Sequence, residues 1–274
     1  MSLSVHTNQS SLTAQRSLAS TQLSLNTSQQ RLSTGLRINS AKDDAAGLQI
    51  ANRMETQTRG LSVAQRNAAD GISMTQTAEG ALKEASNILQ RQRELALQAS
   101  NGTNTTADRG ALAEEFNALN KELDRIKTTT TFAGKALFTS ALKGGVSIQV
   151  GTSMSAGNAI TAKLTKVDAA FTKAADLAST TTAFTATLKS LDDAMTAMGS
   201  SMAELGALQN RFQSTINNLS NIEENVSVAK GRIMDADIAK ESANMTKQNM
   251  MMQAGISVLS QANQTPSMIM GLLR

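Results

Sequence analysis

Two adjacent carboxylates, Asp43 and Asp44, follow Lys42 in the stretch RLSTGLRINSAKDDAAGLQIANRM, residues 31–54. A pair of acids could transfer protons or bind a divalent cation. Neighbouring side chains on a helix point about 100° apart, however, so such a pair rarely converges on one ion. Ser40 can act as an N-cap, with Asp43 three residues later, and the helix dipole favours acids in the first turn. We therefore predict that Ser40, Asp43 and Asp44 start a helix rather than form a catalytic site.

The rest of the chain offers little chemistry. His6 is the one histidine, and there is no cysteine. A Ser–His–Asp triad or a Cys–His pair is therefore impossible elsewhere in the chain. The glycine-rich nucleotide motifs and the HExxH zinc motif are missing as well. We expect no catalytic residue, no metal and no cofactor, which disfavours an enzyme.

The composition favours long helices. The chain has 274 residues, no Trp or Tyr, one Pro and 2% aromatics, so its apolar mass is mostly Ala, Leu, Ile, Val and Met. The net charge of +4 comes from scattered basic residues without aromatics to stack bases, so we expect no nucleic-acid partner. No apolar run approaches the ~20 residues that span a bilayer, and the first residues lack the apolar core of a secretory signal. We expect no membrane partner, and any export to use another route.

The C-terminal half carries a heptad seam typical of a coiled-coil helix. Its apolar residues recur every seven positions: Leu191, Met198, Leu205, Phe212, Leu219, Val226 and Ile233. After Ile233 the phase shifts, and a second series follows: Ile238, Met245, Met252 and Leu259. The shift predicts a domain boundary near residue 234, and Pro266 at the next step predicts the end of the last helix. Seven of the fourteen methionines lie beyond residue 233, as suits a flexible helical interface.

The N-terminal half has a similar plan. Leu18, Leu25 and Leu32 form a short heptad series, and an interruption follows at 35–40. We predict a long helix from about 43 to 100 and a third helix that Thr105 and Asp108 cap. In the middle, Val146, Ile148 and Val150 alternate with polar residues, as do Ile160, Ala162 and Leu164, which predicts a hairpin with Gly157 in its loop. The fold class we expect is mainly α, a long-helix coiled-coil bundle built from both halves with a small β-hairpin element in the middle.

Five long stretches together resemble bacterial flagellins, the subunits of the flagellar filament. They are LSTGLRINSAKDDAAGLQIANRM, GLSVAQRNAADGISMTQTAEGAL, ILQRQRELALQASNGTN, LGALQNRFQSTINNLSNIEENVSVAKGRIMDADIAKESANMTKQ and QAGISVLSQANQTPSMIMGLLR. The resemblance that they carry extends over nearly all of 1–127 and 188–274, in the order of the family. The resemblance implies a short form with only two domains: an inner coiled-coil domain, D0, at 1–42 and 235–274, and D1 at 43–234, with the hairpin element at about 128–182.

The resemblance also implies a function. We expect an extracellular structural subunit that polymerises for swimming motility after export, unfolded, by the flagellar type III apparatus. Its expected partners are further copies of itself, an export chaperone, the filament cap and the hook–filament junction proteins. The residues expected to form the D0 assembly seam are Leu18, Leu25, Leu32, Ile238, Met245, Met252 and Leu259, and those of the D1 core are Leu191, Met198, Leu205, Phe212, Leu219, Val226 and Ile233. Ser40, Asp43 and Asp44 then stand at the D0–D1 junction.

The stretch QRQRELALQ resembles the site that Toll-like receptor 5 recognises in the family. By motif position, the expected contacts are Arg91, Leu95, Gln98 and Glu115, with Leu89 serving the bundle while Leu95 faces elsewhere. Contacts between subunits are the alternative role for these residues. A hook–filament junction protein is the main alternative for the whole chain, and an intracellular coiled-coil scaffold is another.

Overall fold

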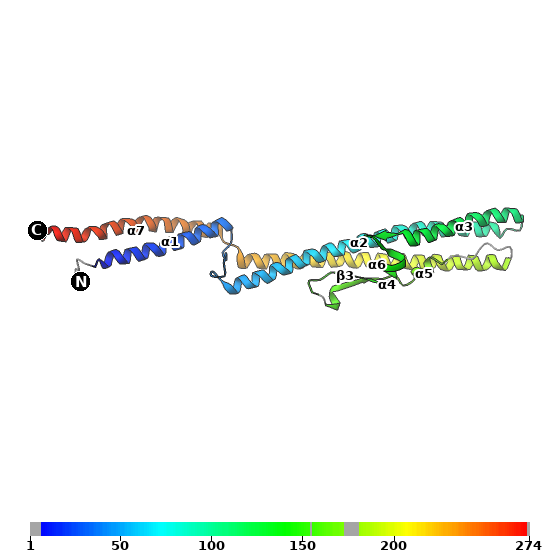
Figure 1. The fold of residues 1–274 in the computed structure, drawn as a ribbon, viewed down its shortest axis with the longest axis horizontal. Helices are drawn as coiled ribbons and strands as arrows, with labels where there is room; N and C mark the ends of the chain where they lie inside the picture. Colours follow the sequence, from blue (N-terminus) through cyan, green and yellow to red (C-terminus); the bar gives the residue numbers. More distant parts are fainter. Residues whose placement is uncertain (1–6, 154, 173–180, 273–274) are drawn as a thin grey trace. The chain divides into compact units, whose positions relative to one another are not determined.

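The computed structural model describes residues 7–153, 155–172 and 181–272, and Figure 1 shows their fold. Long helices dominate, as the composition and heptads predict. The chain divides by its internal packing into two units, each made from both halves of the sequence: residues 1–56 with 225–274, called unit 1, and residues 57–224, called unit 2. We describe each unit by itself.

Unit 1 is a pair of helices with a joint at one end. Helix α1 (Gln9–Thr34) packs along helix α7 (Ile238–Leu272), and the unit also contains the start of α2 (Ala45–Ala99) and the end of α6 (Thr181–Met234). The side chain of Asn8 caps α1, and Gly35 ends it in the left-handed conformation at φ +71°. Helix α6 ends at Met234, where the heptad phase breaks.

The last helix corrects one prediction. Pro266 does not end α7, which continues to Leu272. A proline inside a helix removes one N–H donor and is tolerated when another group satisfies the carbonyl that it leaves. The Asn8 side chain donates to the carbonyl of Ala262, four residues before Pro266.

Unit 2 is built on α2 and α6, with α3 (Thr106–Thr129) returning along α2 (Figure 1). Thr105 and Asp108 form the predicted capping box at the start of α3: the Thr105 hydroxyl accepts from the Asp108 N–H, and the Asp108 carboxylate accepts from the Thr105 N–H at 2.9 Å. Apart from the end of α7, the boundaries of the long helices therefore agree with the sequence predictions to within a few residues.

The middle of the chain covers this helical frame. Strands β3 (Val146–Gln149) and β4 (Ala159–Ala162) form the predicted antiparallel hairpin, with Ile148 opposite Ile160 and the short helix η2 (Ala156–Asn158) in the loop. A second hairpin, β1 (Thr131–Phe132) with β2 (Lys135–Ala136), was not predicted. It turns through Ala133 and Gly134, both at positive φ, as a tight type I′ turn requires. A π-helical turn, η1 (Leu137–Ala141), and two short helices, α4 (Leu142–Gly144) and α5 (Val167–Ala170), complete the segment.

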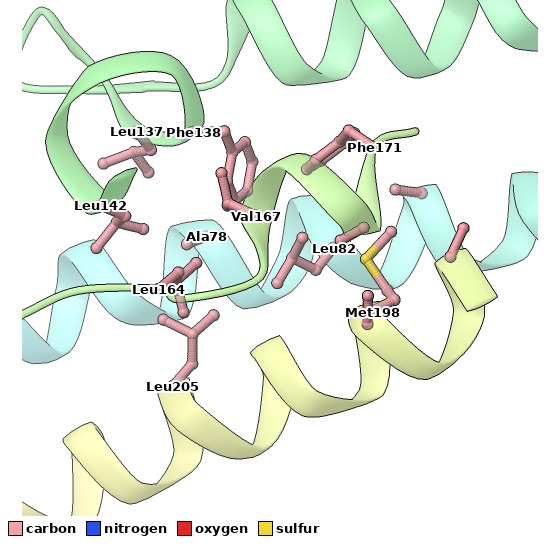
Figure 2. Close-up of a cluster of buried hydrophobic side chains, with 14 of the residues drawn as sticks. Ala78, Leu82, Leu137, Phe138, Leu142, Leu164, Val167, Phe171, Met198 and Leu205 are labelled. Atoms are coloured by element: carbon pink, nitrogen blue, oxygen red, sulfur yellow. The ribbon is translucent and has the colours of Figure 1, made fainter. Parts of the chain in front are cut away.

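The core of unit 2 lies where this middle segment meets the two long helices. Figure 2 shows Leu137, Phe138 and Leu142 on one side and Ala78 and Leu82 of α2 on the other, with α6 closing the cluster. The rings of Phe138 and Phe171 lie 5.0 Å apart between centroids and tilted by 49°. The apolar side chains of the middle segment thus pack against α2 and α6 and cover the core.

Candidate assembly surface and joint

The two breaks between the long helices of unit 1 are tied to each other by backbone pairing. The Arg37 N–H donates to the Met234 carbonyl at 2.6 Å, and the Ala236 N–H donates to the Gly35 carbonyl at 2.9 Å. Leu36 and Asp235 form the antiparallel bridge between them. The Arg37 guanidinium adds a hydrogen bond to the Ile233 carbonyl at 2.8 Å. The breaks at 35–44 and 235–237 therefore form one joint.

Asp43 holds the loop of this joint. One of its carboxylate oxygens accepts hydrogen bonds from the Asn39 N–H at 3.0 Å, the Ser40 N–H at 2.9 Å and the Ser40 hydroxyl at 3.1 Å. These bonds, that from the Asn39 backbone first, lower the pKa of Asp43 below its ordinary value because they stabilise the charged carboxylate. The Asp43 carboxylate therefore accepts its hydrogen bonds from the neighbouring residues of its own loop.

Asp44, not Ser40, caps the long helix. Its side-chain oxygen accepts from the Gly47 N–H at 2.8 Å, and its carbonyl accepts from the Leu48 N–H at 3.0 Å, the two bonds of an N-cap residue. The prediction of Ser40 as the cap was wrong because Asp43 folds back on Asn39 and Ser40, which moves the first helical residue to Ala45. The two acids thus do separate structural tasks and do not converge.

The predicted D0 seam residues differ in burial. Leu25 is buried at 4% exposure, and five others are half-buried: Leu18, Leu32, Met245, Met252 and Leu259. Ile238 is instead 50% exposed, and Glu241, one turn later, is buried, with its carboxylate 4.0 Å from Arg31. The inner face between α1 and α7 therefore combines one buried leucine and half-buried apolar side chains with buried polar ones, Ser11, Thr21, Ser28 and Glu241.

The outer faces of the same two helices carry exposed apolar side chains. We call them the outer apolar set: Leu12, Leu23, Ile238, Met250, Met251, Ile256 and Val258, whose exposures run from 44% for Leu12 to 69% for Leu23. Single exposed apolar residues are ordinary on a protein surface, but seven on one helix pair, on more than one side of α7, leave much apolar surface that further subunits could cover. The pattern favours burial against a further helix.

The predicted D1 core residues are mostly buried. Leu191, Met198, Leu205, Phe212 and Leu219 are at most 6% exposed, whereas Val226 and Ile233 are half-buried and belong to unit 1. The ring of Phe212 lies so close to α2 that a Cβ added at Gly71 would stand 2.9 Å from it. Gly71 therefore permits the two helices to approach.

One residue of the predicted receptor site was placed wrongly. Leu95 is fully buried in the core cluster rather than facing away from the bundle. The reason is that α2 packs against two helices at this level: Gln92 bonds to Asn120 of α3, and Arg93 pairs with Asp192 of α6 at 2.8 Å. The buried face is thus wide enough to include both Leu89 and Leu95.

The other three residues lie on the surface of unit 2. Arg91 and Glu115 pair at 2.8 Å, with their side chains 48% and 45% exposed, and Gln98 is exposed. Leu97, which the sequence did not single out, is 46% exposed two residues after Leu95. At 100° per residue, Leu97 stands about 120° around α2 from Arg91, so it does not share the face of Arg91.

The described part of the chain holds no cluster of potential metal ligands. Across 7–153, 155–172 and 181–272, no three His, Cys, Asp or Glu side chains gather as metal ligands. His6 lies outside the described residues. A pocket of about 340 Å³ between α2 and the two hairpins is mostly apolar, with Asp70 and Lys135 among its lining residues. No described helix is long and apolar enough to cross a bilayer.

Comparison with known proteins identifies the family. Residues 5–143 match the bacterial flagellin N-terminal helical region, and residues 188–273 match the bacterial flagellin C-terminal helical region. A flagellin of Halalkalibacterium halodurans is 45% identical over 85% of this chain and 86% of its own. Flagellin C of Vibrio anguillarum is 37% identical, with both chains covered in full.

Solved structures agree. Bacillus cereus flagellin is 30% identical, covers 56% of this chain and 88% of its own, and gives a TM-score of 0.50. A flagellar hook-associated protein of Vibrio parahaemolyticus, 17% identical with a TM-score of 0.58, covers 70% of this chain and all of its own, and shares the fold. Both family regions, the full-length relatives and the long-helix architecture coincide, so the chain belongs to the bacterial flagellins, structural proteins of the flagellar filament.

Proposed function

We propose that the outer apolar set is the surface on which subunits of this chain polymerise. The observation that carries the proposal is the contrast within single helices: α1 buries Leu25 against α7 while Leu23, two residues earlier, is 69% exposed. Burying one such leucine contributes about 1.5–3 kcal/mol. In the monomer, α1 and α7 pack only through their inner face, and Leu23 stays exposed. Burial of Leu23 against the next copy would then contribute this free energy to polymerisation.

Elongation of short filament seeds by purified protein tests this proposal. Leu23→Gln should keep the monomer's helical content and slow elongation about tenfold or more, because each 1.4 kcal/mol is a factor of ten. Gln22→Ala, one residue away on an exposed polar position, is the matched control and should elongate normally. Equal elongation by Leu23→Gln and the unchanged chain would refute the role of this face.

The same assay separates the two flagellar roles. A filament subunit adds to its own seeds without limit, whereas a hook–filament junction protein stops after the first layer. The likeness to the hook-associated structure concerns the fold alone, and the full-length flagellin relatives favour the filament role.

We place the D0 and D1 domains of the family at 1–42 with 235–274 and at 43–234. These limits coincide with the helix breaks at the joint, while the packing units divide between 56 and 57 and between 224 and 225. Limited proteolysis of the monomer tests the assignment: a stable fragment that has lost roughly forty residues from each end supports it. Resistance of both ends would favour a preordered scaffold instead.

The route out of the cell in this proposal is unfolded export through the flagellar type III apparatus, with a chaperone on the C-terminal segment and a cap that folds subunits at the tip. The small inner core of unit 1 supports it, because a chain without a large core at its ends unfolds there readily. Deleting the export ATPase should abolish the extracellular protein, and deleting residues 238–274 should abolish chaperone binding in a pull-down.

A receptor of the Toll-like receptor 5 type would meet the exposed face around Arg91, Gln98 and Glu115. Leu97 is exposed but stands about 120° around α2 from Arg91, so it lies outside that face. In a reporter-cell assay, Arg91→Ala should weaken signalling without unfolding the monomer, and Leu97→Ala should weaken it less. Leu95→Ala should act only through stability, so a loss of signalling with unchanged thermal stability would contradict this assignment.

A further inference from the structure

Two neighbouring methionines of α7 differ from the others in their exposure. Met250 is 59% exposed and Met251 is 46% exposed. Every other methionine whose side chain the structure describes is buried or half-buried, and Met74 and Met198 in the core of unit 2 are at most 6% exposed. Small reagents in solution therefore reach the thioethers of Met250 and Met251 directly.

The periodicity of α7 explains these exposures. Met252 belongs to the seam and is half-buried. At about 100° per residue, Met251 stands about 100° around the helix from Met252, and Met250 stands about 160° from it. The side chain of Met250 therefore points away from the seam, and that of Met251 lies on the flank of the helix. We call these two residues the outward pair.

The composition makes the thioether the most readily oxidised group of the chain. There are fourteen methionines and no cysteine, tryptophan or tyrosine, so no thiol, indole or phenol competes for an oxidant. With hydrogen peroxide, a sulfur lone pair attacks one peroxide oxygen, the S–O bond forms, the O–O bond breaks and water leaves. The sulfur is oxidised by two electrons and the peroxide is reduced by two. The product, methionine sulfoxide, is polar where methionine was apolar.

We propose that the outward pair is a reversible oxidation site that controls the addition of a subunit to the filament. This inference rests on the proposed function of the outer apolar set, to which both residues belong. In a free subunit both thioethers meet solvent and react with peroxide. A sulfoxide brings a polar S=O group into a surface that the next copy buries, and burial of a polar group without a hydrogen bond opposes association. In an assembled subunit the same burial excludes the oxidant.

The site does not depend on the order of the chain ends before assembly. Ends that are unfolded in the monomer expose both thioethers at least as well as the helix pair does. Methionine sulfoxide reductases reverse the reaction by passing the oxygen to a dithiol, which becomes a disulfide as water is released. Because this chain has no cysteine, the dithiol forms no disulfide with it.

Seed elongation with hydrogen peroxide as the oxidant tests the proposal. Full-length monomers are oxidised until peptide mass spectrometry shows conversion of the outward pair but not of Met74 and Met198, and are then added to unoxidised seeds. Elongation should slow about tenfold or more, as loss of one apolar contact predicts. Treatment with the reductases for both sulfoxide epimers should restore the rate. The same peroxide dose on finished filaments should leave the outward pair largely unoxidised.

Two variants assign the effect to the outward pair. In both, the seam residues Met245 and Met252 are replaced by leucine, so that seam oxidation contributes nothing even where the ends are unfolded. The second variant also carries Met250→Leu and Met251→Leu, which keep apolar side chains of similar volume. Peroxide should slow elongation of the first variant and leave that of the second unchanged. Equal slowing of both would overturn the proposal.

The Leu23→Gln variant separates this inference from the proposed function. Equal elongation by oxidised and unoxidised chains, with both sulfoxides present, would reject the oxidation site, while slow elongation of Leu23→Gln would still support the assembly surface. Normal elongation of Leu23→Gln would instead refute the assembly surface, and this inference with it.

Discussion

The two units of this chain use apolar residues in opposite ways. All six phenylalanines lie in unit 2, five of them at most 5% exposed, and three of the six belong to the middle segment that covers the core. In the described part of unit 1, the buried apolar side chains are Leu25, Ile38 and Ala51, while the outer apolar set stays exposed. Unit 2 thus derives its stability from its own core, whereas unit 1 retains apolar surface whose burial requires another molecule.

The core of unit 2 gives the largest expected effect. Phe212→Ala should lower the free energy of unfolding by about 3–5 kcal/mol, because the fully buried ring fills the space against Gly71 of α2. Urea unfolding followed by circular dichroism measures the change. Leu97→Ala, at 46% exposure in the same unit, is the control and should change it by about 0.5 kcal/mol or less. Similar losses for the two variants would contradict a single sealed core.

Two leucines of α1 test the contrast inside unit 1. Leu25→Ala should cost about 2 kcal/mol of local stability, at the low end for a buried leucine because the seam closes around few buried neighbours. Leu23→Ala should leave the monomer unchanged within about 0.5 kcal/mol and slow seed elongation instead. Amide exchange in α1 measures the first effect. If Leu25→Ala left exchange unchanged, the seam would contribute nothing in the monomer.

The joint gives a smaller effect and separates its two acids. Asp44→Ala removes the cap of α2 and should cost about 1 kcal/mol, and Asp44→Asn should retain most of the stability because asparagine also caps. Thermal unfolding of the monomer measures both. Ser40→Ala should have the smaller effect of the two alanine changes, and the reverse order would restore Ser40 as the cap.

The smallest effect is the pH dependence of the loop. Hydrogen bonds from Asn39 and Ser40 lower the pKa of Asp43. Those from Thr105, the hydroxyl first, lower the pKa of Asp108. A carboxyl group whose pKa is lowered in the folded state contributes its full stabilisation to that state above its ordinary pKa of about 4. The contribution is lost as the pH falls through the pKa of the folded state. Exchange of the Asn39 and Ser40 amides should therefore rise, relative to their intrinsic rates, only below about pH 4. In Asp43→Asn, that acid-dependent step should disappear.

The sequence predicted the regular elements well because their causes are local. Heptad spacing, the Thr105–Asp108 capping box and the alternation around Ile148 each act within a few residues, and each element is present. The β1–β2 hairpin was missed because its strands have two residues each, too few for a periodicity, and only the Ala133–Gly134 turn could have indicated it.

Two of the errors share another cause, contacts between segments far apart in the sequence. Leu95 is buried because two helices pack against α2 there, and α7 continues past Pro266 where Asn8, from the other end of the chain, contributes a donor. Helix periodicity does not encode such pairings. They depend on which segments meet.

The backbone pairing at the joint also restricts how chains of this kind can vary in length. Because Gly35 and Arg37 bond to Ala236 and Met234, a residue inserted in one break would shift its pairing against the other. In the described part of the loop between β3 and β4, the backbone hydrogen bonds, such as that from the Val150 N–H to the Asn158 carbonyl, stay within the loop. Insertions and grafted peptides should therefore be accepted at the hairpin loop and rejected at the joint.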